Sequence, residues 1–369
     1  MDLKFVVCDG QSYNSLQNWL EKLMLIYSFL YFYAMNEALV SILTPFKNTE
    51  AFIAECLDSI VAQTYCGWEL IIVNDHSTDN SYNIVHDYAQ KDKRIKLIRN
   101  EDHGIIEALR TAFKNSTGDY ITRMDSDDIM SPQKLETMTA QLQSHGSGHI
   151  ALGMVNYFSD AGISDGYSRY EKWLNELTQK GDNFSDIYKE CVIASPCWMV
   201  HRFDLIACGA FEPNRYPEDY DLTFRFYESG LICLPSDQIL HYWRDYSWRT
   251  SRTHEHYALN YFLDIKLHYF LKLNYDANRP LVVLGAGYKG KTIATYLIEH
   301  NIEFYWICDN PRKIGIKIYD TLLYDYPTID TLENPQIIVS VANDEAQKEI
   351  KTLFKAKALE AMKDYFFFC

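Results

Sequence analysis

The segment WELIIVNDHSTD, residues 68–79, joins a run of apolar residues directly to a run of polar ones. Its apolar part, Trp68 to Val73, is short and rich in β-branched residues, as is typical of a strand that is buried on both faces. Its polar part, Asn74 to Asp79, is made of residues that form turns after such strands. The segment therefore predicts a buried strand whose C-terminal end opens onto a polar crevice.

Strands and amphipathic helices alternate on both sides of this segment. Short apolar runs are separated by stretches in which apolar residues recur at helical spacing. Such alternation is typical of a mostly parallel sheet with helices on both faces, and we expect the first strand to stop before Pro45. The predicted strands are residues 39–43, 68–73, 95–99 and 120–124, and the predicted helices are residues 50–63, 80–90 and 104–114.

The segment RMDSDD, residues 123–128, places three carboxylates at the end of a predicted strand. Asp125, Asp127 and Asp128 repel one another, and such a cluster is stable where a cation binds. Oxygen ligands suit Mg²⁺ or Mn²⁺, and ligands of open α/β sheets bind beyond the carboxyl ends of the strands. The alternative is an acidic loop that caps the next helix.

Acids also stand in two other segments that can reach the same crevice. Asp75 follows the strand at residues 68–73, where a carboxylate can accept hydrogen bonds from a nucleobase or from ribose hydroxyls. PEDYDLTFRF, residues 217–226, begins a predicted helix with Glu218 and Asp219. A carboxylate there is competent as a general base, although both segments could simply cap helices.

Four segments, in this order and spacing, closely resemble the family 2 glycosyltransferases of GT-A fold: SILTPFKNTEAFIAECLDSIVAQTY, WELIIVNDHSTDNS, GDYITRMDSDD and PEDYDLTFRF. The resemblance covers about residues 37–254. It implies an inverting transfer of a sugar from a nucleotide donor, commonly a UDP-sugar, to a hydroxyl group. Asn74 and His76 stand where the family usually has Asp and Gly, and the Gln-x-x-Arg-Trp motif of processive synthases is absent, which favours single additions.

The resemblance also implies roles for individual residues. Asp219 would be the general base, with Glu218 beside it. The segment of residues 241–254 resembles the one that follows the acidic motif in a bacterial subgroup, so that its arginines would close over the diphosphate, unless it is an ordinary surface loop. The metal ligands would be Asp125, Asp127 and His241. The nucleotide-sugar ligands would be Pro45, Asp75, Arg123, Asp125 and Arg244.

A new strand–helix rhythm begins after residue 279, with a predicted strand at residues 281–284 and a glycine-rich motif that follows it. LVVLGAGYKGKTIATYL carries Gly285, Gly287 and Gly290, and Asp309 lies 19 residues past the last of these glycines. A strand, a glycine turn, a helix and a later acid match the dinucleotide-binding fingerprint, in which a helix N-terminus meets phosphate. We therefore expect a small Rossmann-like domain. NAD or a nucleotide-sugar is its possible ligand, and a purely structural role is the alternative.

Length and composition limit the remaining possibilities. The chain has 369 residues, enough for two domains, and its net charge of −15 argues against nucleic-acid binding. Nine cysteines without a Cys-x-x-Cys pair argue for a reducing, cytoplasmic compartment. Residues 23–35 are apolar but too short to span a membrane, and could lie at the inner face of the cytoplasmic membrane. The predicted domains are an N-terminal extension (1–34, non-native or membrane-surface), a GT-A domain (35–254), a helical linker (255–278) and a Rossmann-like domain (279–369).

The sequence thus predicts a metal-dependent glycosyltransferase that acts on a cell-surface glycan or lipid-linked glycan acceptor. A non-catalytic nucleotide-sugar-binding protein is one alternative, and an NAD-binding oxidoreductase that uses the C-terminal domain is another. A nucleotidyltransferase is a third, but TPFKNTE, residues 44–50, is not the basic glycine-rich loop that such enzymes usually carry near the first strand.

Overall fold

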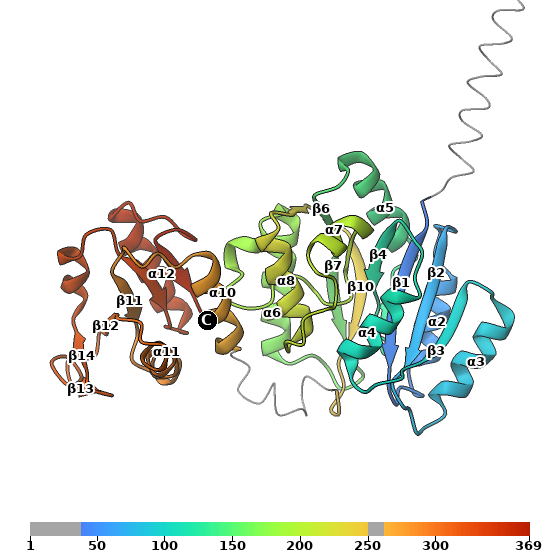
Figure 1. Cartoon of the computed structure of the whole chain (residues 1–369), viewed down its shortest axis with the longest axis horizontal. Coiled ribbons are helices and arrows are strands. Elements are labelled where there is room, and N and C mark those ends of the chain that lie inside the picture. Colours follow the sequence, from blue (N-terminus) through green and yellow to red (C-terminus); the bar gives the residue numbers. More distant parts are fainter. Residues whose placement is uncertain (1–37, 250–261) are drawn as a thin grey trace, which may run out of the picture.

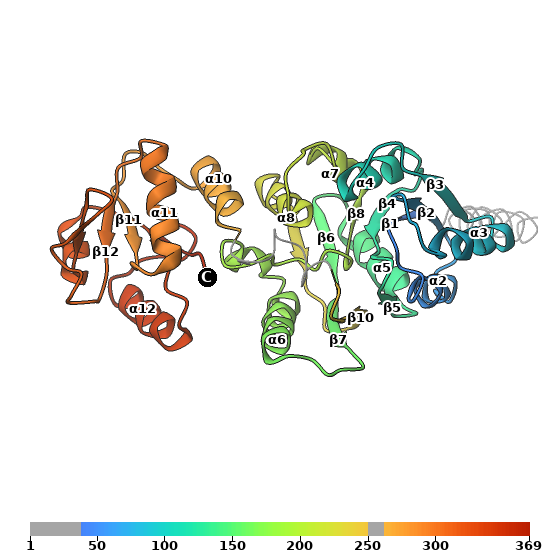
Figure 2. The same ribbon diagram turned by 90° about the horizontal axis from the view of Figure 1, so that it is seen from below.

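The computed structural model describes residues 38–249 and 262–369. The predicted N-terminal extension and residues 255–261 of the predicted linker lie outside these ranges. Figure 1 shows two α/β units side by side, with helix α10 (Leu263–Leu273) between them, and Figure 2 shows the same arrangement from below. Within the described ranges, no helix has the length and apolar character needed to cross a membrane.

The first unit is built on a seven-stranded sheet of order β3-β2-β1-β4-β8-β6-β9. Strands β3, β2, β1 and β4 are parallel, as predicted, whereas β8 is antiparallel to both β4 and β6. The carboxyl ends of the four parallel strands therefore share one edge of the sheet. The strands are β1 (Val40–Phe46), β2 (Trp68–Asn74), β3 (Ile95–Arg99), β4 (Tyr120–Arg123), β6 (His149–Leu152), β8 (Trp198–His201) and β9 (Ile232–Leu234).

Strand β1 is longer than predicted. It continues through Pro45 to Phe46, and the prediction that the proline stops the strand was wrong. The pairing of β1 with β4 ends at Leu43, opposite Arg123, while the pairing with β2 continues. Proline is tolerated here because one neighbouring strand has already ended, so that its missing N–H breaks no ladder on that side.

Helices cover both faces of this sheet, as the alternation predicted. Leu43 packs in a hydrophobic cluster with residues of α4 (Ile105–Lys114). Its neighbour Ile42 packs in a second cluster with α2 (Ile53–Val61) and α3 (Ser81–Lys91). Because successive side chains of a strand point to opposite faces, both faces of β1 are apolar, which explains the uninterrupted apolar runs of the sequence.

The region after residue 155 contains a long helix that was not among the predicted elements, α6 (Asp165–Lys180). Its signals were present in the sequence. Ser164 caps the helix by accepting a hydrogen bond from the amide of Tyr167, and Leu174 and Leu177 lie on its buried side. The other elements here are β5 (Ile129–Met130), α5 (Lys134–His145), β7 (Met154–Phe158), η1 (Asn183–Asp186), α7 (Arg202–Ala207), α8 (Glu218–Glu228) and β10 (Ile239–Arg244).

The second unit is a six-stranded sheet of order β13-β14-β12-β11-β15-β16. All its pairings are parallel except that of β13 with β14. The predicted strand at residues 281–284 is β11, with the same bounds. The elements are β11 (Leu281–Leu284), α11 (Tyr288–Glu299), β12 (Tyr305–Ile307), β13 (Lys317–Ile318), β14 (Thr321–Tyr324), η3 (Tyr326–Thr331), β15 (Gln336–Val339), α12 (Asp344–Ala356) and β16 (Tyr365–Phe367).

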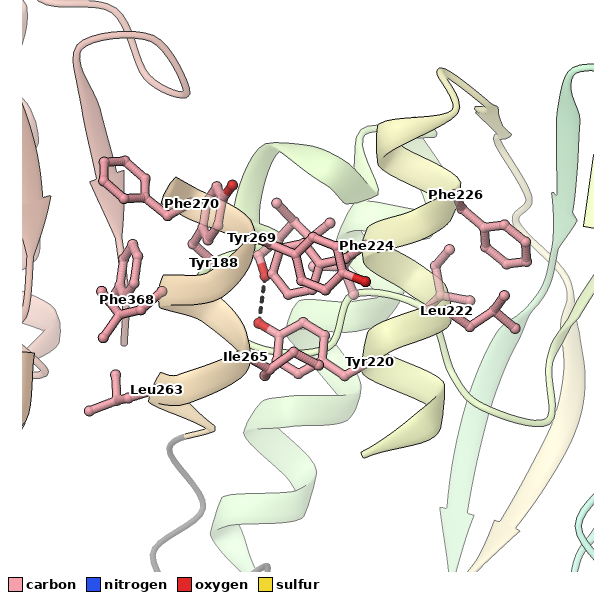
Figure 3. Packing of buried hydrophobic residues seen from close by; sticks show 14 of the residues in the cluster. Tyr188, Tyr220, Leu222, Phe224, Phe226, Leu263, Ile265, Tyr269, Phe270 and Phe368 are labelled. Carbon is pink, nitrogen blue, oxygen red and sulfur yellow. Dashed lines mark hydrogen bonds between the residues drawn. The ribbon is translucent and has the colours of Figure 1, made fainter. Parts of the chain in front are cut away.

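An aromatic core joins the two units, as Figure 3 shows. The ring of Phe224 in α8 stacks on that of Tyr269 in α10, with 4.5 Å between the ring centroids. Tyr188, which follows η1, stacks on Phe368 at 5.3 Å. Helix α8 therefore packs against α10, and Tyr188 lies between Phe224 of α8 and Phe368 of the second unit. The first turn of α8 faces the polar edge of the first sheet.

Candidate functional site

Arg123 joins two acidic segments that are far apart in the sequence. It ends β4, and its Nε donates to Oδ1 of Asp125 at 3.0 Å. Its Nη1 donates to Oε1 of Glu218, the first residue of α8, at 2.9 Å. The RMDSDD segment and the start of α8 thus meet at one place, as the sequence predicted for a single crevice.

Asp219 lies next to this ion pair and carries a carboxyl group with an unusual pKa. Burial raises the pKa of Asp219 to about 7, and the charge of Glu218 adds to this effect, while Arg123 opposes it. Oδ1 of Asp219 accepts a hydrogen bond from the amide of Tyr220 at 2.8 Å. A carboxylate with such a pKa can take up a proton near neutral pH, as a general base requires.

Asp127 lies in the loop after β4 with a similarly raised pKa. Burial and the neighbouring charge of Asp128 raise the pKa of Asp127 to about 7, although Arg249 opposes the shift. The hydroxyl of Tyr246 donates to Oδ2 of Asp127 at 2.7 Å. Asp127 is thus held among other acids with little solvent, and together with Asp125 it offers the oxygen ligands that suit a divalent cation.

Asp128, by contrast, anchors the loop to strand β10. It is fully buried, and its Oδ1 accepts the amide of Arg244 at 2.8 Å. Its Oδ2 lies 3.0 Å from Nε2 of His241, whose other ring nitrogen lies 3.4 Å from Nζ of Lys134. Burial and Lys134 keep the pKa of His241 well below its ordinary value, so the ring is neutral and donates to Asp128. Both nitrogens of His241 are thus engaged in this structure, and its predicted role as a metal ligand stays a prediction.

Arg244 also contacts protein groups rather than an open crevice. Its Nε donates to the backbone oxygen of Asp127 at 2.8 Å, and its Nη2 pairs with the carboxylate of Glu55. Its guanidinium lies over the rings of Phe52 and Phe158, at 4.8 and 4.5 Å from their centroids. In this arrangement Arg244 supports the backbone of the acidic loop, and its predicted contact with a sugar donor stays a prediction.

The nucleotide end of the predicted site lies beyond β2. Oδ1 of Asp75 accepts from Nδ2 of Asn100 at 2.8 Å and from the amide of Gly104 at 3.0 Å, while Oδ2 lies 3.5 Å from Nζ of Lys47. Pro45 is buried in the adjacent strand β1. Asp75 is therefore at the same sheet edge as Asp125, with β1 between their strands.

Sequence reasoning missed three residues of this edge. Asn100 follows β3 just as Asp75 follows β2, and Lys47 follows β1, so the rule that ligands gather at strand ends would have found both. Tyr246 carried no such signal. It reaches Asp127 only because β10 pairs with β5 in the small sheet beside the loop.

His76 departs from the family pattern at a position with a special backbone. Its φ is 58°, in the left-handed region that favours glycine, which explains why glycine is usual there. The imidazole stacks on that of His103, with 3.9 Å between the ring centroids, and Nε2 of His76 lies 2.9 Å from the backbone oxygen of Asp102. Ligand atoms of Asp75, His76 and His103 lie within 4.8 Å of one another.

The glycine motif of the second unit lies between β11 and α11. Gly285 has a φ of 111°, and a Cβ on Gly290 would lie 2.1 Å from the backbone oxygen of Gly285, so both glycines are needed for the turn and the close approach. A Cβ on Gly287 would meet no atom within 4 Å. Asp309, after β12, is exposed.

Comparison with known proteins identifies relatives of this chain. The model of the family described as "Glycosyl transferase family 2" matches residues 41–209. An uncharacterized glycosyltransferase of Haemophilus influenzae is 30% identical over 233 residues, which cover 60% of this chain and 70% of that protein. The putative glycosyltransferase EpsE of Bacillus subtilis is 30% identical over 202 residues, 52% of this chain and 67% of EpsE.

The matched stretch covers only part of some other relatives. EpsJ, an uncharacterized glycosyltransferase of B. subtilis, is 37% identical over 122 residues. These residues make up 33% of this chain and 36% of EpsJ. Among solved structures, S. aureus TarS 1–349 in complex with UDP-GlcNAc superposes with a TM-score of 0.51 and 20% identity, over 65% of this chain and 68% of that one. This likeness shows the fold.

The fold is that of the GT-A glycosyltransferases, a mainly parallel α/β sheet flanked by helices. The chain belongs to glycosyl transferase family 2. The family and fold class predicted from the four segments are confirmed, whereas the domain bounds and the roles of the individual site residues stay predictions.

Proposed function

We propose that the protein transfers a sugar, with inversion, from a nucleotide-diphosphate sugar to a hydroxyl group of a glycan acceptor, with the help of Mn²⁺ or Mg²⁺. The observation that carries the proposal is the Arg123 contact. It brings the acidic segment after β4 together with the first turn of α8, where Asp219 has a pKa of about 7. One site thus combines a place for a cation with a group that can accept a proton.

The sugar donor would lie along the carboxyl edge of β2, β1 and β4. Asp75 would bind the nucleoside through its Oδ2, which faces Lys47. Its Oδ1 is already held by Asn100 and Gly104. A UDP-sugar is our first choice, since TarS 1–349, which shares the fold, was solved with UDP-GlcNAc. The identity of the nucleobase and the identity of the sugar are both part of this proposal.

Asp127 and Asp125 would hold the metal ion beside the diphosphate. A bound divalent cation would supply charge stabilisation to the nucleoside diphosphate that leaves. The chain's own contribution is to orient the carboxylates. Tyr246 fixes Oδ2 of Asp127, and Arg244 fixes the backbone of the loop.

Asp219 would remove the proton of the attacking hydroxyl. With a single base on the acceptor side and no nucleophile required on the protein, the displacement inverts the anomeric carbon. Glu218 is less suited to this role, because its carboxylate is paired with Arg123.

The first test is a thermal-shift screen of UDP-, GDP- and dTDP-sugars with and without Mn²⁺, followed by a transfer assay with the stabilising sugar donor. We expect one class of donor to raise the melting temperature, and more so with Mn²⁺. Stabilisation without any transfer to glycan or lipid-linked glycan acceptors would favour a non-catalytic nucleotide-sugar-binding protein instead. Cell fractionation tests the proposed site of action, the cytoplasm or the inner face of the membrane.

We propose in addition that the glycine loop of the C-terminal unit binds a phosphate-containing ligand, NAD or a nucleotide-sugar. Gly287 supports this, because the open space around it gives no packing reason for a glycine. Asp309 stands after the next strand, where the fingerprint places a ribose-binding acid. Titration calorimetry of the full chain with NAD and with UDP-sugars, compared with Gly287→Val, tests it. Heat that is unchanged in the variant would contradict the proposal.

A further inference from the structure

We propose that Arg123 is a positioning residue that selects Asp219, rather than its neighbour Glu218, as the base. The guanidinium binds Glu218 and leaves Asp219 available to the acceptor hydroxyl. This inference rests on the proposed transferase function. It also replaces the role in nucleotide-sugar binding that the sequence suggested for Arg123.

Arg123 is only 5% exposed, and every nitrogen of its fork faces a carboxylate. Nε and Nη2 both lie 3.0 Å from Oδ1 of Asp125, and Nη1 lies 2.9 Å from Oε1 of Glu218. To contact a sugar donor, the guanidinium would have to abandon both acids and leave them unpaired in a buried place, which is strongly unfavourable. The geometry therefore favours a fixed bridge over a ligand contact.

The two adjacent acids of α8 differ in what holds them. Glu218 is 9% exposed and is in a charge-assisted pair with Arg123, so protonating it would break that pair. Asp219, within the described residues, receives a hydrogen bond only from the backbone amide of Tyr220. Asp219 therefore bears the cost of burial without an ion pair, and it is the acid that gains by accepting a proton.

The groups that face Asp219 come from four segments. On its own helix stands Glu218, and from the end of β4 come Arg123 and Asp125. Tyr170 of α6 and Cys191 lie close enough for the charge of Asp219 to raise their pKa values, after the larger effect of burial. Among the described groups with the largest influence on Asp219, Arg123 is the cation, so its removal would raise the pKa of the base.

The test compares Arg123→Gln, Arg123→Lys and the double variant Arg123→Gln/Glu218→Gln. For Arg123→Gln we expect kcat to fall about 100-fold, as for loss of a positioned base, with the KM for the sugar donor within threefold. The acid limb of the kcat profile should move to higher pH. Arg123→Lys should recover part of the lost kcat. The double variant should have a kcat at least tenfold higher than that of Arg123→Gln, because no unpaired Glu218 then competes for the proton.

Arg225→Gln is the matched control. Arg225 is a buried arginine of α8 that pairs with Asp221 at 2.8 Å, on the side of the helix that faces α10. This variant should lose stability with its acid limb unmoved. A rise in donor KM at unchanged kcat in Arg123→Gln would overturn the inference in favour of donor binding, and an unmoved acid limb would overturn it in favour of a purely structural pair.

Failure of the proposed function would be visible separately, as a wild-type protein that transfers no sugar. The inference remains testable in that case, by carboxyl-carbon NMR titration of Asp219 in the wild type and in Arg123→Gln. We expect the pKa of Asp219 to be higher in the variant. Equal pKa values in the two proteins would overturn the inference.

Discussion

The two sheets of this protein use the same architecture and differ in what they gather at the strand ends. Both place parallel strands next to helices and put polar residues after the strands. At the first sheet, burial and the charges of neighbouring acids raise the pKa of Asp127 and that of Asp219 to about 7. At the second sheet, the turn is built of glycines and Asp309 is exposed.

The scaffold thus supplies a position at the strand ends, and the burial of charge supplies the chemistry. An acid at an exposed strand end is an ordinary carboxylate in water, whereas a partly desolvated acid among other acids binds protons or cations strongly. We therefore expect catalysis to depend on the first sheet and ligand binding or support on the second.

Asp219→Asn should abolish most transfer. An amide cannot accept the proton, so kcat should fall about 10³-fold, within the usual range for a general base. The affinity for the sugar donor, measured by calorimetry, should stay within a few fold, because Asp219 faces the acceptor. Transfer at the wild-type rate would show that the base lies elsewhere.

Asp127→Ala should remove the dependence on metal together with most of the activity. The loss of a carboxylate that fits the cation should lower kcat/KM by about 100-fold or more, and Mn²⁺ should no longer raise the melting temperature in the presence of the sugar donor. Asp309→Ala is the matched variant in the second sheet, and transfer should persist in it. Equal losses in the two variants would break the comparison between the sheets.

Gly290→Ala and Gly287→Ala separate packing from ligand space in the second unit. The Cβ of the first variant would lie 2.1 Å from a backbone oxygen, so overpacking should cost about 1–3 kcal/mol of unfolding free energy. The Cβ of Gly287→Ala would meet no atom within 4 Å, so this variant should change the free energy of unfolding by less than about 0.5 kcal/mol. Denaturant unfolding measures both, and equal losses would show that Gly287 is also a packing residue.

The rate should depend on pH through Asp219. Because its pKa is raised to about 7, the carboxyl is protonated below that pH and cannot act as a base. With saturating Mn²⁺ and sugar donor, kcat should fall about tenfold per pH unit on the acid side of pH 7. A profile that stays flat down to pH 5 would contradict the assignment of Asp219.

Much of the fold could be predicted because its signals are local. The strand at residues 281–284 and the strand at residues 95–99 have the predicted bounds, since short apolar runs between turns mark a buried strand whatever surrounds it. Helix α6 was not predicted, although the capping residue Ser164 and the helical spacing of the apolar residues indicated it. Strand β1 was predicted too short. Whether the strand can contain Pro45 depends on where β4 ends, which no local pattern reveals.

At the site, the chemical groups themselves can be read from the sequence: the acids after β2 and β4 and at the start of α8, and the glycines after β11. The tertiary structure alone decided how they differ. It paired Glu218 with Arg123 and left Asp219 apart, and it turned His241 toward Asp128. The physical reason is that residue type and chain spacing are local, whereas desolvation and ion pairing are set by neighbours that only the folded chain brings together.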